Sequence, residues 1–556
     1  MRIRKLVLAT TLALMLVAFA IAIATPNVNG QQIVPPPVVS APAGKLRGSV
    51  EGKLHVFKGI PYAIAPTGSR RWKPPEEMPK WNDTRDATKF GPACVQNNNP
   101  SESIYYSKLA SMSEDCLSLN VWAPANARNA PVFFWIHGGS LSGGTGSDEM
   151  YDGASLAQRG LVVVTINYRL GVLGYLAHPA LSAESPDHVS GNYGLLDQIE
   201  ALRWVKRNVA AFGGDASNVT IAGESAGGLS VMYLLTSPAA RGLFSKAIAQ
   251  SAYMISTPEL KTSTFGDIPA ETIGTYLQGK LGASDIAAMR SMDAVAITAQ
   301  SAQGGYLPFG TVDGRVLPRQ LVEVLDRGEQ AKVPILAGFN SGEIRSLRFL
   351  MPPPPASAET YEKMIHDRYG ELADSFLKRY PSSDIPESML ATTRDAFYGW
   401  TAERLVAKQA AIGVSSFFYF FDHTYPAADS RGLHAFHASE LPYVFGNADK
   451  TAPNWPKLPT TTEDKRLSDA MTDYWATFAR RGVPTATGQP AWPAYGREHG
   501  FMEFADKPQA KTRLLPGMYE LMEQVVCRRR AKGGIPWNWN IGLASPPLPP
   551  ASPQCK

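Results

Sequence analysis

Long apolar runs are missing from this chain of 556 residues, except at its N-terminus. Residues 6–24 are nearly all apolar, follow three basic side chains within the first five positions, and end in small residues at Ala22 and Ala24. This pattern is typical of a secretory signal peptide, which we predict over residues 1–24. An uncleaved membrane anchor is the alternative, because the run is near the lower length limit for a span. We therefore expect an exported protein, secreted or periplasmic, with no membrane span after cleavage.

An excess of one charge is also lacking. Lys and Arg number 54 against 49 Asp and Glu, a formal net charge of +5, and the basic residues form no block. Nucleic-acid-binding proteins carry clustered basic residues, so we expect no nucleic-acid partner. Hydrophobic residues make up 44% of the chain and charged residues 19%, which is the ordinary composition of a globular protein.

Cysteine is scarce, with only Cys94, Cys116, Cys527 and Cys555. No CxxC motif and no paired Cys/His spacing is present, so a metal centre is not expected. An even number of cysteines in an exported chain favours disulfides, and four cysteines allow three pairings. The local pairing, Cys94 with Cys116 and Cys527 with Cys555, is the simplest because it closes two short loops.

Internal repeats are absent too, and composition divides the chain into a few parts. After the signal peptide, residues 25–43 are rich in Pro, Val and Ala and are predicted to form a flexible lead-in. Residues 44–543 are then predicted to form one folded domain. Residues 544–556 are a Pro-rich tail, which contains Cys555 and can be tied back to the domain.

What the domain does contain is an alternation of apolar strand-length runs with helical patterns. Strands buried on both faces of a sheet have continuous apolar sequences, and strand–helix alternation indicates a parallel sheet. A helix is expected over 197–212. We predict an α/β fold with a central, mostly parallel sheet flanked by helices. The candidate strands are residues 131–136, 161–166, 218–222, 245–251, 333–338 and 415–421.

The sharpest local motif is G-x-S-x-G at residues 223–227, centred on Ser225. A strand-like run precedes it, and a helical pattern follows from Gly228. Such a tight strand-to-helix turn needs neighbours without side chains, and it presents the hydroxyl at a helix N-terminus that favours negative charge. Ser225 is therefore the predicted nucleophile. A glycine-rich turn with an incidental serine is the alternative.

A second glycine-containing turn, residues 137–140 (HGGS), directly follows an early strand. Acyl transfer needs hydrogen-bond donors aimed at the developing oxyanion, and glycine lets backbone N–H groups approach a substrate closely. The N–H of Ala226, the residue after the nucleophile, is a further donor of this kind. An ordinary strand-ending turn is the alternative interpretation.

These motifs occur within a longer series of segments that resembles the type-B carboxylesterase and cholinesterase family. The resemblance runs from about Gly44 to Pro516. It implies an α/β-hydrolase fold with helical cap insertions, hydrolysis of small-molecule carboxylic esters, and no metal or organic cofactor. The matching segments, in the order of the family, are FKGIPYA (57–63), RWKP (71–74), SEDCLSLNVWAP (113–124), NYRLGVLG (167–174), GNYGLLD (191–197), FGGD (212–215) and GESAGG (223–228).

The resemblance also implies the other members of a Ser-Glu-His triad. The acid of the family lies in a G-x-N-x-x-E-G segment, which places it at Glu343, although Gly342 and Ile344 depart from the pattern. The histidine of the family precedes a segment similar to ELPYVFG, which gives His437, followed by Ala438 where the family has Gly. His434 is the rival base, but it lacks this offset.

Supporting groups follow from the same resemblance. The oxyanion donors correspond to the N–H groups of Gly139, Ser140 and Ala226, with Ser140 in place of the third glycine of the family. The N–H of Ser140 can still donate if its backbone angles suit a residue with a Cβ. Ser251 matches a serine that hydrogen-bonds the acid in relatives.

The substrate is less well indicated. Specificity is expected in cap segments near 253–307 and 345–400. The loop from Cys94 to Cys116 contains Tyr105 and Tyr106 but no Trp, so the cation–π site of cholinesterases is not expected. Exported bacterial relatives that hydrolyse bulky polycarboxylate, fumonisin-type esters have a similar order of segments.

Two arginines are relevant to a polycarboxylate ester substrate. Arg345 and Arg348 follow the predicted acid and can meet an anionic acyl group, although two solvated arginines are the simpler interpretation. A lipase, and a non-catalytic binding protein of the same fold, are further alternatives. Chains of the latter kind lack a triad member, whereas all three positions are filled here. The sequence does not indicate an oligomeric state.

Overall fold

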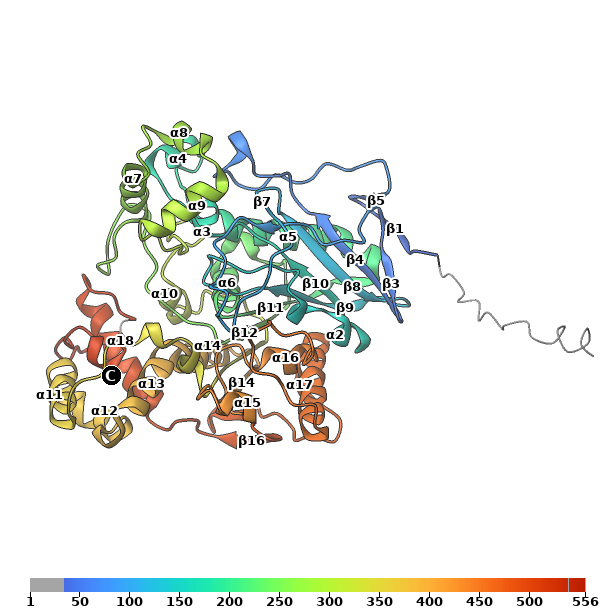
Figure 1. Cartoon of the computed structure of the whole chain (residues 1–556). Helices are drawn as coiled ribbons and strands as arrows, with labels where there is room; N and C mark the ends of the chain where they lie inside the picture. Colours follow the sequence, from blue (N-terminus) through green and yellow to red (C-terminus); the bar gives the residue numbers. More distant parts are fainter. Residues whose placement is uncertain (1–34, 539, 556) are drawn as a thin grey trace, which may run out of the picture. The chain divides into compact units, whose positions relative to one another are not determined.

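A mixed sheet of 11 strands crosses the part of the protein that the computed structural model describes, residues 35–538 and 540–555 (Figure 1). Its strands β9 to β15 are parallel to their neighbours, and antiparallel strands complete both edges. The mostly parallel sheet predicted from the sequence is confirmed. In spatial order the strands are β16 (Pro508–Thr512), β15 (Gly500–Phe504), β14 (Ser416–Phe421), β13 (Ile335–Asn340), β12 (Lys246–Gln250), β11 (Gly214–Glu224), β9 (Ala130–Ile136), β10 (Val162–Ile166), β8 (Ser118–Pro124), β4 (Leu54–Pro61) and β3 (Ser49–Glu51).

Both faces of the sheet are buried, which explains the continuous apolar sequences of its strands. In β9 the side chains of Phe133 and Trp135 belong to one core cluster, whereas Val132, Phe134 and Ile136 belong to the other. All five are fully buried. The period of two residues along a strand therefore divides one apolar run between two cores.

Helices cover each face. The predicted helix at 197–212 is displaced: α5 begins at Tyr193 and ends at Asn208, and a short 3-10 turn, Val209–Phe212, completes it before the left-handed Gly213. On one face lie α5 (Tyr193–Asn208), α6 (Ala226–Thr236) and α14 (Trp400–Ala411). On the other lie α2 (Ala154–Gln158), α16 (Leu441–Phe445) and α17 (Thr462–Arg481).

Two helical insertions extend from the carboxyl side of the sheet, in the regions where cap segments were expected (Figure 1). Between β12 and β13 the chain forms α7 (Ala270–Lys280), α8 (Ile286–Ser291) and α9 (Ala294–Gln303). Between β13 and β14 it forms α11 (Ala358–Tyr369), α12 (Ala373–Arg379) and α13 (Ile385–Arg394). The remaining elements are β1 (Val38–Ala41), β2 (Gly44–Arg47), β5 (Arg85–Asp86), β6 (Ala93–Cys94), β7 (Met112–Ser113), α3 (Gly171–Tyr175), α4 (Pro179–Glu184), α10 (Leu321–Asp326), α15 (Pro426–Asp429) and α18 (Met518–Lys532).

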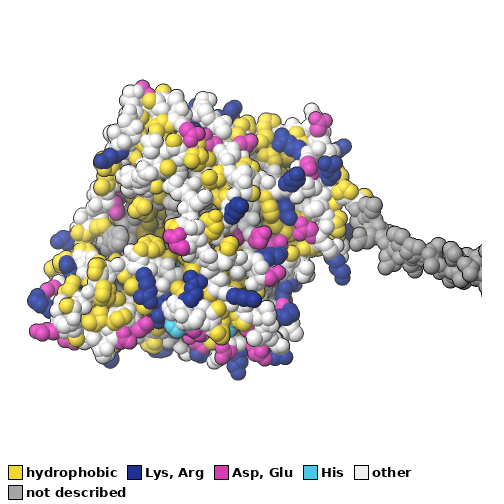
Figure 2. Space-filling view, in the orientation of Figure 1, with side chains coloured by type: hydrophobic (Ala, Val, Ile, Leu, Met, Phe, Trp, Pro, Cys, Tyr) yellow, Lys and Arg dark blue, Asp and Glu magenta, His cyan; other side chains and the backbone are white. Residues whose placement is uncertain are grey.

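Both disulfides of the local pairing are present, so that pairing is confirmed. Cys527–Cys555 ties the Pro-rich tail to α18, and the tail is further held where the N–H of Leu548 donates to the carbonyl of Arg368 at 2.8 Å. On the face seen in Figure 2, basic and acidic side chains are interspersed, in keeping with the small net charge.

The N-terminal boundary needs a correction. Residues 25–43 were expected to be a flexible lead-in; residues 25–34 lie outside the described residues, and in the remainder β1 (Val38–Ala41) pairs antiparallel with β2 (Gly44–Arg47). The valines that suggested a loose segment are β-branched and fit a paired strand. The predicted signal peptide, residues 1–24, lies outside the described residues. No helix in the described part of the chain is both long and apolar enough to cross a membrane.

Candidate active site

Ser225 occupies a strained turn between β11 and α6. Its φ of 57° and ψ of −122° are unusual for a residue with a side chain, and such strain clusters at functional sites. The turn depends on its glycines. A Cβ on Gly223 would lie 2.5 Å from backbone atoms of Gly227, and a Cβ on Gly227 would overlap the carbonyl oxygen of Ile136. The motif therefore lets the elbow pack directly on the end of β9.

The loop at residues 137–140 lies against this elbow. A Cβ on Gly138 would come within 3.2 Å of the Cβ of Ser225. Gly139 has a φ of 104°, and Ser140 adopts the left-handed region at 56°. Among the described residues no hydrogen-bond acceptor faces the N–H of Gly139, Ser140 or Ala226. Three backbone donors near the serine are thus unused and can bind an anion.

A buried histidine stiffens the same loop. Burial lowers the pKa of His137 to about 4, so its ring is neutral at neutral pH. Its Nδ1 lies 2.8 Å from the carbonyl oxygen of Gly138, to which it can donate. The hydroxyl of Tyr168 donates to the carbonyl of His137 at 2.9 Å, and the two rings stack. These contacts hold the donor loop and were not evident from the sequence.

His437 and Glu343 are joined directly. The Nδ1 of His437 is hydrogen-bonded to one carboxylate oxygen of Glu343, and the other oxygen accepts from the N–H of Asn340 at 2.8 Å. Glu343 follows the end of β13 and is fully buried. The chain departs from the family motif at Gly342 for a structural reason, because a Cβ at this position would lie 2.8 Å from the carbonyl oxygen of Ala435.

A further carboxylate faces the imidazole. The Nε2 of His437 lies 3.1 Å from an oxygen of Glu224, the residue before Ser225. Burial lowers the pKa of His437, but Glu224 and Glu343 outweigh it and raise the pKa to about 9. Burial also raises the pKa of Glu224 to about 8. Sequence reasoning missed Glu224 as a site residue, although it lies inside the motif.

Glu440 connects the surroundings of His437 to Ser225 through a hydrogen-bond network. Its carboxylate accepts from the side chains of Gln250 at 2.9 Å and Asn340 at 2.7 Å. The backbone carbonyl of Gln250 also accepts from the N–H of Ser225 at 3.0 Å. The ends of β11, β12 and β13 are therefore coupled beneath the site. Glu440 belongs to the ELPYVFG-like segment that was used only to place His437.

The rival base His434 and the predicted supporting residue Ser251 make no hydrogen bond with Glu343 in the described structure. His434 is half exposed, binds Asp429 at 2.8 Å and does not contact Glu343. Ser251 is fully buried and its N–H donates to the carbonyl of Gly338 at 2.9 Å. In the described structure its hydroxyl makes no hydrogen bond to Glu343 and instead lies beside the phenol of Tyr419.

Aromatic rings border the imidazole on the cap side. The ring of Tyr398 lies 5.2 Å from that of His437, and Tyr253 lies 6.3 Å from Tyr398. Tyr398 belongs to a π-helical turn, Asp395–Gly399, a kind of element frequent at functional sites. Both tyrosines lie within the cap segments expected from the sequence, which did not single out either of them.

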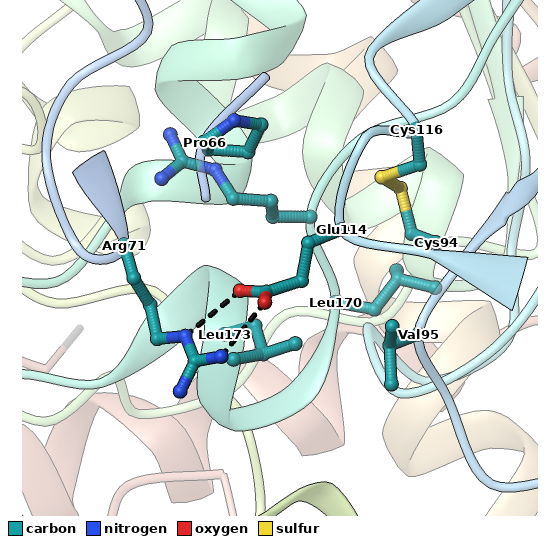
Figure 3. Close-up of a pocket in the computed structure, with 9 residues that line it drawn as sticks. Pro66, Arg71, Cys94, Val95, Glu114, Cys116, Leu170 and Leu173 are labelled. Atoms are coloured by element: carbon teal, nitrogen blue, oxygen red, sulfur yellow. Dashed lines mark hydrogen bonds and ion pairs between the residues drawn. A yellow bond between two sulfur atoms is a disulfide. The ribbon is translucent and has the colours of Figure 1, made fainter. Parts of the chain in front are cut away.

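A cavity beside the Cys94–Cys116 disulfide is a feature of the packing and not a candidate substrate site (Figure 3). At about 10 Å³ it has room for no more than a water molecule. Arg71 binds both carboxylate oxygens of Glu114 there, at 2.8 and 2.7 Å. No cluster of three His, Cys, Asp or Glu side chains suited to a metal ion occurs within the described ranges.

Comparison with known proteins agrees with this geometry. The profile described as "Carboxylesterase family" matches residues 35–521. Fumonisin B1 esterase of Sphingopyxis macrogoltabida is 37% identical over 483 residues, covering 84% of this chain and 86% of that protein. Para-nitrobenzyl esterase of Bacillus subtilis (strain 168) is 37% identical over 474 residues, covering 83% and 93%.

Solved structures agree as well. A structure titled PNB esterase superposes with a TM-score of 0.76 at 33% identity, covering 87% of this chain and 99% of that one. The sheet, its flanking helices and this likeness confirm the α/β-hydrolase fold. The chain belongs to the carboxylesterase family and is a carboxylic ester hydrolase.

Proposed function

We propose that the protein is an exported serine carboxylesterase that hydrolyses small-molecule esters through an acyl-enzyme on Ser225. The observation that carries the proposal is the imidazole of His437. Its Nδ1 is bound to the buried Glu343, and its Nε2 faces the elbow that holds Ser225. An imidazole oriented in this way can act as a base through Nε2 once that nitrogen is unprotonated.

The proposed reaction has two steps. His437 takes the proton of the Ser225 hydroxyl as the oxygen attacks the ester carbonyl, and then gives that proton to the departing alcohol. Water deacylates the serine by the same route. Glu343 fixes the tautomer and stabilises the imidazolium. The unused N–H groups of Gly139, Ser140 and Ala226 support their assignment as the oxyanion hole.

Export is supported by two observations. Residues 1–24 have the pattern of a signal peptide, and all four cysteines are paired in disulfides. Disulfides persist in secreted and periplasmic proteins and are rare in reducing compartments. Mass spectrometry of the protein recovered from culture medium or periplasm tests this part, and a start near Ala24 is the expected result.

Polycarboxylate esters are less favoured as substrates, although one relative is named a fumonisin B1 esterase. Arg345, which was a candidate for binding an anionic acyl group, forms an ion pair with Glu387 at 2.6 Å. The positive charge of Arg345 is therefore already balanced by the carboxylate of Glu387. A non-catalytic binding role is disfavoured because serine, histidine and glutamate are all present and assembled.

The test compares the mature protein with Ser225→Ala on p-nitrophenyl butyrate as a time course. Ser291→Ala, a serine exposed at the end of α8, is the matched control. We expect Ser225→Ala to lose activity by several orders of magnitude and Ser291→Ala to keep it. Equal activity of Ser225→Ala and wild type would exclude Ser225 as the nucleophile.

A further inference from the structure

The loop closed by Cys94–Cys116 reaches across the molecule to the segment that carries His437. Asn454, which follows that segment, donates from its side-chain amide to the carbonyl oxygens of Ser101 and Ser103, at 2.6 and 3.1 Å. The loop and the histidine segment are thus joined by contacts between residues about 350 positions apart in the chain.

Tyr105 lies at the centre of this contact and is held from several sides. Its N–H donates to the hydroxyl of Ser103 at 3.2 Å, and its carbonyl accepts from the side chain of Asn99 at 3.0 Å. Its ring packs edge-on against Trp455, with centroids 6.0 Å apart, and Trp455 packs on Phe436 at 4.8 Å. The ring therefore has one position relative to the histidine segment.

The hydroxyl of Tyr105 contacts both segments that hold the base and the acid. It donates to the backbone carbonyl of His437 at 2.9 Å and lies 2.8 Å from the hydroxyl of Ser346. Ser346 belongs to the same short 3-10 turn as Glu343. Burial raises the pKa of the phenol well above its usual value, so it remains a neutral donor.

The carbonyl that Tyr105 binds belongs to a strained peptide. The next residue, Ala438, has a φ of 67°, in the left-handed region that disfavours a side chain. Such a conformation persists only when its surroundings hold it. A hydrogen bond to the carbonyl of His437 fixes the plane of that peptide, and hence the point from which the imidazole extends.

We propose that Tyr105 is a positioning residue, which sets the imidazole of His437 and the Glu343 turn relative to Ser225, and that the Cys94–Cys116 loop serves to deliver it. This inference rests on the proposed function, because it assumes that His437 is the base. Displacing a reacting group by about 1 Å costs about 100-fold in rate, so a hydrogen bond remote from the substrate can control turnover.

The test uses Tyr105→Phe, which removes only the hydroxyl, and the neighbouring Tyr106→Phe as control, because no hydrogen-bond partner of the Tyr106 hydroxyl occurs among the described residues. We expect Tyr105→Phe to lower kcat for p-nitrophenyl butyrate by about 10- to 100-fold. Its KM should stay within twofold of wild type. Tyr106→Phe should resemble wild type in both constants.

Ala438→Gly separates a positioning role of Tyr105 from a general effect on the stability of the fold. Glycine relieves the left-handed strain, so the kcat loss caused by Tyr105→Phe should differ between the wild-type and Ala438→Gly backgrounds, which a double-mutant cycle measures.

If Tyr105→Phe does not accumulate as folded protein, Asn454→Ala replaces it. That variant releases the loop from outside the site, and it should lower kcat without changing KM.

The outcomes are separable from those of the proposed function. A kcat of Tyr105→Phe within twofold of wild type, while Ser225→Ala is inactive, overturns the positioning role alone. A rise in KM at constant kcat overturns it as well, because it would indicate a substrate contact. Full activity of Ser225→Ala overturns the proposed nucleophile and the positioning role together.

Discussion

The Nε2 of His437 lies 3.1 Å from a carboxylate oxygen of Glu224, so the imidazole is placed between two acids. Glu343 holds its other nitrogen, and the buried carboxyl group of Glu440 lies nearby. A carboxylate next to an imidazole stabilises the protonated form. Glu224 is thus expected to influence when the base is available.

The first prediction concerns Glu224→Gln. An imidazolium cannot accept the Ser225 proton, and the surrounding carboxylates raise the pKa of His437. Removal of one carboxylate charge should lower that pKa and move the acidic limb of the kcat/KM profile to lower pH. The profile between about pH 5 and 10 checks this, with Glu102→Gln at an exposed position as control. A limb that stays in place or moves upward contradicts the prediction.

The second prediction concerns Gly227→Ala. The new Cβ would overlap the carbonyl oxygen of Ile136, which is backbone and cannot move without disturbing β9. We expect a loss of about 1–3 kcal/mol or more in unfolding free energy, measured by urea denaturation. Gly279→Ala is the control, because a Cβ at this helical position meets no atom within 4 Å. The control should be neutral or more stable by about 0.5–1 kcal/mol.

The third prediction concerns Ser140. Its N–H is an assigned oxyanion donor and its φ is 56°, a value that glycine adopts freely and proline cannot. Ser140→Gly should keep the activity, whereas Ser140→Pro should lower kcat/KM by about 100- to 1,000-fold. Circular dichroism verifies that both variants are folded. Near-wild-type kcat/KM in Ser140→Pro would remove this N–H from the oxyanion hole.

The fourth prediction separates the two disulfides. Cys527–Cys555 closes 28 residues that include none of the proposed site residues, so replacing both cysteines by Ser should cost about 3–4 kcal/mol of stability in the chain-entropy account. The kcat at room temperature should not change. Replacing Cys94 and Cys116 should instead lower kcat, because that loop carries Tyr105. Thermal melts together with initial rates distinguish the two effects.

The elements that carry the nucleophile were predictable because their signals are local. Apolar runs placed β9 to β14 within one to four residues of their observed ends, and G-x-S-x-G placed Ser225 between β11 and α6. Glu343 and His437 came from resemblance, since they lie 94 positions apart and no sequence pattern brings the two together.

Tyr105, Tyr398 and Glu224 were missed for physical reasons. The contact of Tyr105 with His437 joins residues 332 positions apart, which no periodicity encodes. Tyr398 is presented by a π-turn within a helical sequence. Glu224 has the same appearance in the sequence whether it faces solvent or the imidazole. The strand Val38–Ala41 was mistaken for a lead-in because its pairing with β2 depends on a turn that composition does not reveal.

The two outermost strands of the sheet affect whether the protein can aggregate by strand pairing at high concentration. At one edge β3 (Ser49–Glu51) is only three residues long, and at the other β16 (Pro508–Thr512) begins with a proline and carries Lys511, which binds Glu503. Short, charged and proline-containing edges are poor templates for another chain. The 11-stranded sheet should therefore not grow from molecule to molecule into fibrils, and self-association of the folded protein would have to use other surfaces.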